Sequence, residues 1–323
     1  MKGGGRRGVA IGASILIAAG MSSVTDSAQA QATVDEAVPI GPRQPVTEKD
    51  AGSAIVWDED WPRFQTWQYV AIGAQAVAAL GAQAIPPGGG RLTLNNGFDE
   101  SVRDALRATT YDGYIRARDI SDVGLTLLIN QRIVDSAVVT WWGYDEGSVA
   151  WQMTMIDLQV VTFTAAVNGI VAGVAARERP FKDSLCKAPL EEQTSDCTGN
   201  NRYRSFFSGH TSTAFALAGL TCMHHANVPT YGHPVADGAA CVGALGVAGT
   251  VATMRVVSDQ HWATDIIAGS VFGLGSGLAI PWIFHYSGGA KAKASDEARP
   301  AKPPELSWTV APTPGGAVVS GAF

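Results

Sequence analysis

Three short polar segments contain the residues of this chain that could act together on a phosphate group. They include Arg177, Arg179, Ser208, Gly209, His210, Arg255, His261 and Asp265. Each segment lies at the end of a long apolar stretch. Two histidines, one carboxylate and several guanidiniums are what phosphoryl transfer through a histidine requires without a metal. The segments contain no metal-ligand set, so we expect neither a metal ion nor a cofactor.

The third segment has the most informative spacing, because Asp265 follows His261 by four residues. On a helix, residues four apart lie on the same side. The Asp265 carboxylate could then accept the proton of one ring nitrogen of His261, which would leave the other nitrogen free to attack phosphorus. Arg255 precedes His261 by six residues and could offer its guanidinium to phosphate oxygens.

The second segment is predicted to begin a helix, because Ser208 and the following Thr residues precede an apolar helical pattern. Free N–H groups at a helix N-terminus bind anions. Gly209 would let the backbone approach a phosphate closely. His210 is then a candidate general acid that protonates the leaving oxygen and later activates water.

The first segment follows an apolar run, and Pro180 is expected to end that helix. Arg179 would supply a second guanidinium for the phosphate oxygens, which carry negative charge throughout phosphoryl transfer.

Together the three segments resemble the type 2 phosphatidic acid phosphatase and vanadium haloperoxidase superfamily. The pattern of that family is Lys-x6-Arg-Pro, then Pro-Ser-Gly-His, then Ser-Arg-x5-His-x3-Asp. This chain matches it at Arg179-Pro180, Ser208-Gly209-His210, and Arg255 with His261 and Asp265. The resemblance covers roughly residues 122–284 and implies a helical phosphatase.

The resemblance also implies a role for each matching residue. His261 would be the nucleophile that forms a phosphohistidine, and Asp265 would orient it. His210 would act first as acid and then as base. The phosphoryl oxygens would be held by Arg179, Arg255, Ser208 and Gly209.

Three positions depart from the family pattern. Ala172 stands where the family has Lys, Phe207 where it has Pro, and Met254 where it has Ser. The last two lie beside the phosphate ligands, whereas the first removes one cation from the pocket. Arg177 or Lys182 could replace that cation from the same loop, so Arg177 is included among the predicted phosphate-binding residues.

The composition favours a buried helical architecture, since 46% of the residues are hydrophobic and 16% are charged. Six apolar segments are predicted to form an all-α six-helix bundle, which we expect to lie in a membrane, with a soluble bundle as the alternative. They span approximately Gln65–Ile85, Asp122–Val139, Met153–Ala176, Thr211–Ala226, Gly238–Val257 and Thr264–Phe284. A formal net charge of −6 without a basic stripe argues against nucleic-acid binding.

The ends of the chain differ from this central part. Residues 1–30 have the basic start, short apolar core and Ala-Gln-Ala site of a cleaved export signal. We expect a flexible leader over 31–60, the helical phosphatase domain over 61–286, and a low-complexity tail over 287–323. The stretch Trp308–Phe323 has weak β character.

Four cysteines suit an oxidising compartment. Cys186 and Cys197 flank a polar stretch between the first two segments, and we predict a disulfide there. Cys222 and Cys241 lie in apolar segments and are predicted to be buried thiols. The protein is therefore expected to be exported, either in the membrane with its active site facing the periplasm or soluble in the periplasm.

The leading functional hypothesis is hydrolysis of a phosphomonoester or diphosphate, because an apolar bundle around a polar pocket favours a lipid phosphate. Alternatives are a soluble exported nonspecific acid phosphatase, a vanadate-dependent haloperoxidase, and a non-catalytic protein that binds phosphate or lipid headgroups.

Overall fold

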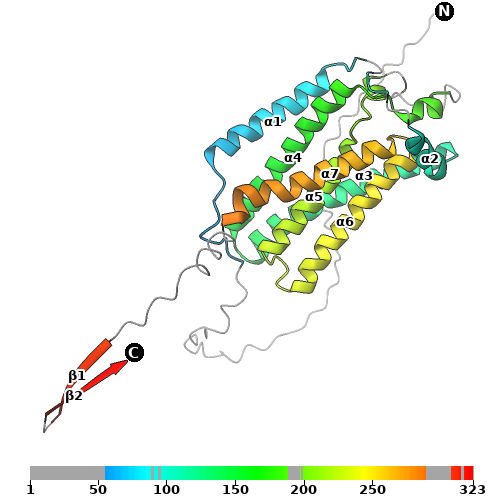
Figure 1. Ribbon diagram of the computed structural model, residues 1–323. Coiled ribbons are helices and arrows are strands. Elements are labelled where there is room, and N and C mark those ends of the chain that lie inside the picture. Colours follow the sequence, from blue (N-terminus) through cyan, green and yellow to red (C-terminus); the bar gives the residue numbers. More distant parts are fainter. Residues whose placement is uncertain are drawn as a thin grey trace, which may run out of the picture. The chain divides into compact units, whose positions relative to one another are not determined.

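The computed structural model describes residues 55–88, 91–93, 96–187, 197, 199–288, 307–313 and 316–322. Six long helices run alongside one another, and a short helix lies at one end of them (Figure 1). The α-helices are α1 (Thr66–Ala84), α2 (Gly97–Leu106), α3 (Tyr111–Ile133), α4 (Gly147–Ala175), α5 (Gly209–Asn227), α6 (Pro234–Val257) and α7 (Ala263–Pro281). The predicted all-α fold is confirmed.

Shorter elements extend or connect these helices. The π-helices η2 (Val134–Gly143) and η8 (Trp282–Tyr286) continue α3 and α7, and the 3-10 helices are η3 (Pro180–Asp183), η4 (Leu185–Lys187) and η7 (Asn200–Tyr203). The second predicted apolar segment, Asp122–Val139, belongs to a helix that begins earlier, at Tyr111. Thr110 caps the helix there by accepting a hydrogen bond from the Gly113 amide.

The two ends of the chain need separate treatment. The predicted export signal and most of the leader, residues 1–54, lie outside the described residues. Near the C-terminus, β1 (Ser307–Thr313) pairs antiparallel with β2 (Gly316–Ala322). The weak β pattern of this stretch therefore corresponds to a hairpin.

Glycines on one side of α7 allow a close contact between this helix and α5. A side chain at Gly269 would lie 2.9 Å from the Ser208 carbonyl oxygen of the α5 cap. One and two turns further on, side chains at Gly273 and Gly277 would overlap the carbonyl oxygens of Ser212 and Ala216. The α5 and α7 backbones therefore touch directly, which holds the polar segment with Ser208 against the polar segment with Asp265.

This contact predicts opposite outcomes for two glycines on α7. Gly273→Ala is expected to lower the thermal unfolding temperature, because its methyl group would overlap the backbone of α5. Gly275→Ala is the matched control, since a methyl group there meets no atom within 4 Å. We expect the control to unfold at the wild-type temperature or higher, because Ala favours helix over Gly by about 1 kcal/mol. Equal unfolding temperatures for the two variants would contradict the tight contact.

A buried network of charges lies away from the predicted catalytic segments. The Arg132 guanidinium of α3 contacts Asp135 at 2.9 Å and Asp157 of α4 at 3.1 Å. His224 of α5 contacts Asp157 at 3.0 Å, and His225 contacts Asp135 at 3.2 Å. Arg132 and Asp135 of the second apolar segment thus face the bundle interior, where they are paired.

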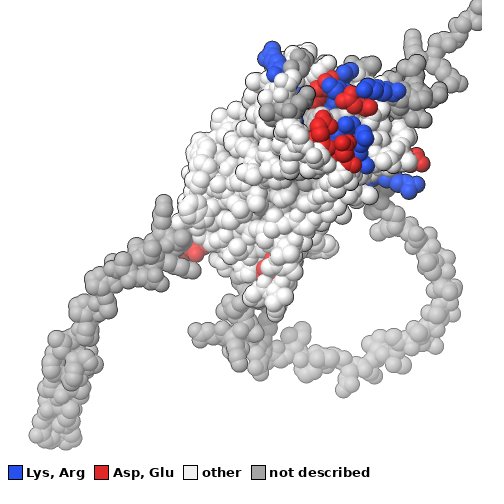
Figure 2. Space-filling view, turned by 45° about the vertical axis from the view of Figure 1, so that its right-hand side comes forward, with Lys and Arg blue, Asp and Glu red and all other residues white. Residues whose placement is uncertain are grey.

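The outer surface of the bundle is apolar. Leu80 and Trp142 are 74% and 81% exposed, and further exposed aliphatic side chains lie on α3, α6 and α7. Figure 2 shows Lys, Arg, Asp and Glu gathered mainly at one end, while the flanks carry few charges. Within the part of the chain that the structure describes, three helical stretches are long and apolar enough to cross a membrane: Gly147–Ala175, Pro234–Val257 and Ala263–Tyr286.

Two disulfides cross-link the described residues. Cys186 and Cys197 are bonded, as the sequence predicted. The prediction of buried thiols at Cys222 and Cys241 is wrong, because these two residues form a second disulfide. Helices α5 and α6 are antiparallel neighbours joined by a short connection. Cys222 lies near the end of the first and Cys241 near the start of the second, which leaves their Cα atoms 4.5 Å apart.

Candidate active site

The predicted segments meet at one end of the bundle, where α4 and α6 end and α5 and α7 begin (Figure 1). Ser208 is the N-cap of α5, and its side chain accepts a hydrogen bond from the Thr211 amide. The Ser208 amide in turn donates to the Asp265 carbonyl oxygen at 3.2 Å. The start of α5 is thereby tied to the start of α7, and the amides of the first α5 turn are left available to an anion.

His261 is held in one orientation by its backbone surroundings. Its ring is 2% exposed, and Nδ1 lies 2.8 Å from the carbonyl oxygen of Ser205. A carbonyl oxygen can only accept, so Nδ1 carries the proton and Nε2 has the free electron pair. Arg179 Nη1 lies 3.4 Å from that Nε2. The unprotonated ring nitrogen thus faces a guanidinium.

The relation between His261 and Asp265 differs from the predicted helical pair. Helix α7 begins only at Ala263, so His261 precedes it. The carboxylate folds back across the helix start, where Oδ2 accepts the Trp262 amide at 3.0 Å and lies 3.7 Å from His261 Nδ1. The nearest acceptor for the imidazole is therefore the Ser205 carbonyl, with the Asp265 charge behind it.

Burial keeps His261 neutral. Desolvation of the ring, together with the nearby charge of Arg179, lowers the pKa of His261 to about 3, although Asp265 acts in the opposite direction. An unprotonated imidazole is what attack on phosphorus requires.

Arg177 has a different environment from the one that the sequence suggested. Its guanidinium is 3% exposed and makes ion pairs with Asp265 and with Asp99 of α2, the latter at 2.7 Å. It also donates to Thr264 at 2.8 Å. These contacts place Arg177 behind the Asp265 carboxylate, where its charge is already neutralised. It is thus badly placed to replace the cation missing at Ala172.

Arg179 lies on the Nε2 side of the His261 ring. Its guanidinium donates to the Gln260 side chain at 2.9 Å and to the Asn201 carbonyl oxygen at 2.9 Å. It also donates to the Arg204 carbonyl oxygen at 3.3 Å. These backbone and amide acceptors hold the guanidinium beside the imidazole of His261.

His210 and Arg255 meet at a carboxylate that the sequence analysis did not include. Asp122 Oδ1 lies 3.0 Å from His210 Nε2 and 3.2 Å from Arg255 Nη1. Burial lowers the pKa of His210, and the positive charges of Arg255 and Arg179 lower it further; after burial, the same two arginines also lower the pKa of His261. Both histidines and both arginines therefore share one electrostatic environment.

The family comparison agrees with this arrangement. The model of the PAP2 superfamily matches residues 155–288, a range that contains all eight predicted catalytic and phosphate-binding residues. Over these residues the chain is similar to the PAP2 superfamily, as the sequence predicted. Members of that superfamily are phosphatases, so the protein is a phosphoric ester hydrolase by class. A search of curated proteins found no match to the chain.

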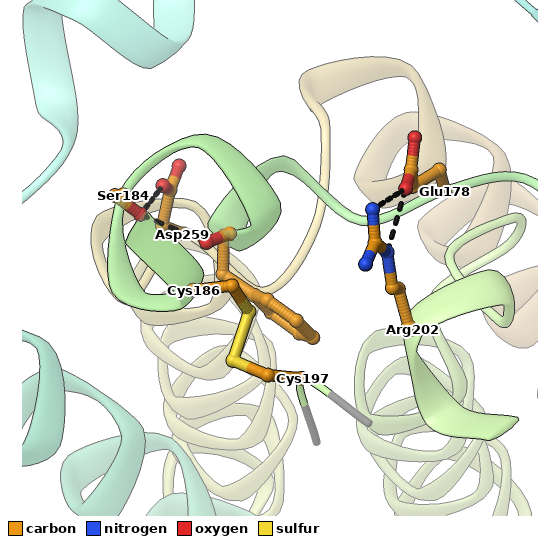
Figure 3. Close-up of a disulfide and its surroundings, with 7 residues drawn as sticks. Glu178, Ser184, Cys186, Cys197, Arg202 and Asp259 are labelled. Atoms are coloured by element: carbon orange, nitrogen blue, oxygen red, sulfur yellow. Dashed lines mark hydrogen bonds and ion pairs between the residues drawn. A yellow bond between two sulfur atoms is a disulfide. The ribbon is translucent and has the colours of Figure 1, made fainter. Parts of the chain in front are cut away.

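The loop between the first two PAP2 segments is fixed at several points (Figure 3). The disulfide Cys186–Cys197 closes it, and Ser184 donates to Asp259 in the connection between α6 and α7. Arg202 forms an ion pair with Glu178, next to Arg179. These links hold Arg179 and the connection before His261 in one framework.

Gly209 is required for packing inside the PAP2 domain. A side chain there would lie 2.8 Å from Asn168 Oδ1 of α4. The Asn168 amide donates to the Phe207 carbonyl oxygen at 2.6 Å, so it cannot move aside without breaking that bond. The close approach predicted for Gly209 is thus an approach to α4 as well as to any bound anion.

Four supporting residues were missed by the sequence analysis: Asp99, Asp122, Asn168 and Ser205. Asp99 and Asp122 lie before the PAP2 match, and their partners are more than 70 residues away in the sequence. A single Asp at the start of an apolar segment was the only signal for Asp122. Among the residues that the structure describes, no group of three or more His, Cys, Asp or Glu could hold a metal ion.

The two histidines predict a bell-shaped dependence of kcat/KM on pH. His261 must be unprotonated, so activity should rise through a pKa of about 3. His210 must be protonated to act as an acid, and burial lowers its pKa from the usual 6.5. Activity should therefore fall as the pH rises through a value lower than 6.5. The Asp122 charge raises the pKa of His210, so Asp122→Asn should move the alkaline limb to lower pH.

Asp119→Asn is the matched control for this measurement, because Asp119 lies on the same helix with a side chain 62% exposed. Its profile should coincide with that of the wild type. An unchanged alkaline limb in Asp122→Asn would show that His210 does not set it.

Proposed function

We propose that the protein hydrolyses a phosphomonoester or diphosphate of a lipid through a phosphohistidine at His261. The observation that carries the proposal is the orientation of this ring: Nδ1 is bound to the Ser205 carbonyl, and the free Nε2 faces Arg179 at 3.4 Å. Nε2 attacks phosphorus as the bond to the leaving oxygen breaks. His210 gives its proton to that oxygen, which departs as an alcohol or as a phosphate.

The second half of the reaction returns the enzyme to its starting state. His210, now neutral, accepts a proton from water while the water oxygen attacks phosphorus. The N–P bond breaks, and its electron pair returns to His261 Nε2. Inorganic phosphate leaves, and no metal takes part in either step.

The charge of the phosphoryl group is held by the same residues in both steps. Arg179 and Arg255 offer guanidinium donors, and the first α5 amides, at Gly209 and His210, add dipolar ones. Asp122 binds both Arg255 and His210, so an arriving phosphate would compete with it for Arg255. Asp265 orients the imidazole from behind, with Arg177 fixing the carboxylate.

The apolar exterior supports a location in the membrane. Soluble proteins rarely expose such continuous apolar surface, and three helical stretches are long enough to cross a bilayer. The charged end that carries the site would then face the periplasm, where the disulfide Cys186–Cys197 persists.

A phosphate-release assay with three substrates tests the proposal. The panel contains a long-chain alkyl phosphate, a polyprenyl diphosphate and p-nitrophenyl phosphate, each assayed with and without a chelator. Release from at least one substrate, unchanged by the chelator, is expected. No release from any of them by folded protein would contradict a phosphatase, and a loss of release with chelator would contradict a metal-free mechanism.

A soluble exported phosphatase is the second candidate, and the disulfide Cys222–Cys241 favours it. This bond lies towards the end of α5 that is remote from the catalytic segments. In a bundle that spans the membrane with its site outside, that end would lie towards the reducing cytoplasm. Extraction of active enzyme without detergent would support the soluble alternative, and a requirement for detergent would support the membrane location.

A further inference from the structure

An apolar groove lies between α1 and α4, apart from the candidate catalytic residues. It has a volume of about 450 Å³ and is lined mainly by small and aliphatic residues of the C-terminal halves of the two helices. Among them are Gly81, Ala82 and Ile85 from α1 or its end, and Gly169 and Gly173 from α4. A volume of this size is typical of sites for small organic ligands.

The groove carries positive charge at its active-site end. Arg91 is one of its lining residues. Arg204 is 6% exposed and donates through Nη2 to the carbonyl oxygens of Ala82 and Ile85 at 2.7 and 2.6 Å. Its Nη1 has no hydrogen-bond partner among the residues that the structure describes, and it lies 4.0 Å from where a side chain would begin on Gly173. A buried guanidinium with an unused donor calls for an acceptor from a ligand.

The groove is connected to the catalytic residues through two consecutive residues. The Arg204 carbonyl accepts the Arg179 guanidinium, and the Ser205 carbonyl accepts the His261 imidazole. The side chain of Arg204 extends in the other direction, to the end of α1. A ligand with a phosphate at His261 and a hydrocarbon chain in the groove would therefore pass beside Arg204.

We infer that this groove binds the hydrocarbon chain of the substrate, an anionic amphiphile whose phosphate reacts at His261. The inference rests on the proposed function. The apolar walls of the groove fit an alkyl or prenyl chain. The guanidiniums of Arg91 and Arg204 can donate hydrogen bonds to oxygens of the headgroup. Specificity for the chain thus comes from α1 and α4, apart from the residues that perform the chemistry.

Two substitutions fill the groove without touching the catalytic residues. A side chain added at Gly81 meets no atom within 4 Å, and one at Gly173 meets only Arg204 Nη1 at 4.0 Å. Gly81→Leu and Gly173→Leu should each raise KM for a hexadecyl phosphate about tenfold or more. Both should leave kcat/KM for p-nitrophenyl phosphate at the wild-type value. Gly73→Leu is the control, because it lies on α1 in open space and does not line the groove.

The outcomes separate this inference from the proposed function. Wild-type KM for hexadecyl phosphate in both groove variants would overturn the inference and leave the phosphatase proposal intact. Absence of phosphate release from every substrate of the three-substrate panel by the folded wild type would overturn the proposed function itself. A second measurement does not depend on the variants folding: an alkyl phosphate with a diazirine on its chain should crosslink to α1 or α4 of the wild-type protein. Crosslinks confined to other helices would also overturn the inference.

Discussion

Replacing His261 with Asn is expected to lower kcat for phosphate release by about 10³-fold or more, the scale of loss when a covalent nucleophile is removed. The Asn amide can still donate to the Ser205 carbonyl, so the local fold should persist, but no nitrogen is left to attack phosphorus. With ³²P-labelled substrate, wild-type enzyme quenched in alkali should retain label on protein, and the variant should not.

The exposed His233 provides a matched control for this change. It caps α6 by accepting a hydrogen bond from the Val235 amide, a bond that Asn can also make. His233→Asn should therefore keep wild-type stability and turnover. Substantial turnover by His261→Asn, or protein-bound label in it, would exclude His261 as the nucleophile.

Replacing Arg177 with Met is expected to lower the free energy of unfolding by about 3–5 kcal/mol, because it leaves two buried carboxylates without their cation. Asp99 and Asp265 are 1% and 0% exposed, so water cannot replace the guanidinium. Since natural domains are stable by only about 5–15 kcal/mol, much of the variant could unfold. Thermal and denaturant unfolding would measure the change, and kcat of the folded fraction should fall because Asp265 loses its fixed position.

Lys182→Met is the control for the loss of a cation in the same loop. Lys182 pairs with Glu178, but the two side chains are 35% and 22% exposed, and such partly exposed pairs contribute at most about 1 kcal/mol. Its unfolding should be close to that of the wild type. If Arg177→Met instead folded normally and raised only KM, Arg177 would be a phosphate ligand, as the sequence suggested.

The proximity of the candidate catalytic residues could be predicted because each segment combines chemically distinctive residue types with fixed spacing. Ser208 at a helix start and the interval from Arg255 to Asp265 are local features, and local geometry is what spacing reports. The six helices followed from apolar stretches longer than strands. For the same reason, the bounds of α3 were missed, since its first turns are polar.

Long-range pairing was not predictable in the same way. Arg177 and Arg179 are two residues apart and chemically identical, yet one is buried against Asp99 and the other faces His261. The two arginines differ because α2 places Asp99 beside Arg177. Cys222 and Cys241 were assigned from their apolar surroundings, although the level at which two antiparallel helices meet decides whether cysteines bond.

The row of glycines on α7 has a consequence for turnover. With backbone directly against backbone, α5 and α7 have no side chains between them that could change rotamer and let one helix slide past the other. The imidazole at 261 and the helix start at 208 are thus fixed at one separation through the catalytic cycle. Room for a product to depart must then come from the surrounding connections or from α3, which carries the partly exposed Asp122.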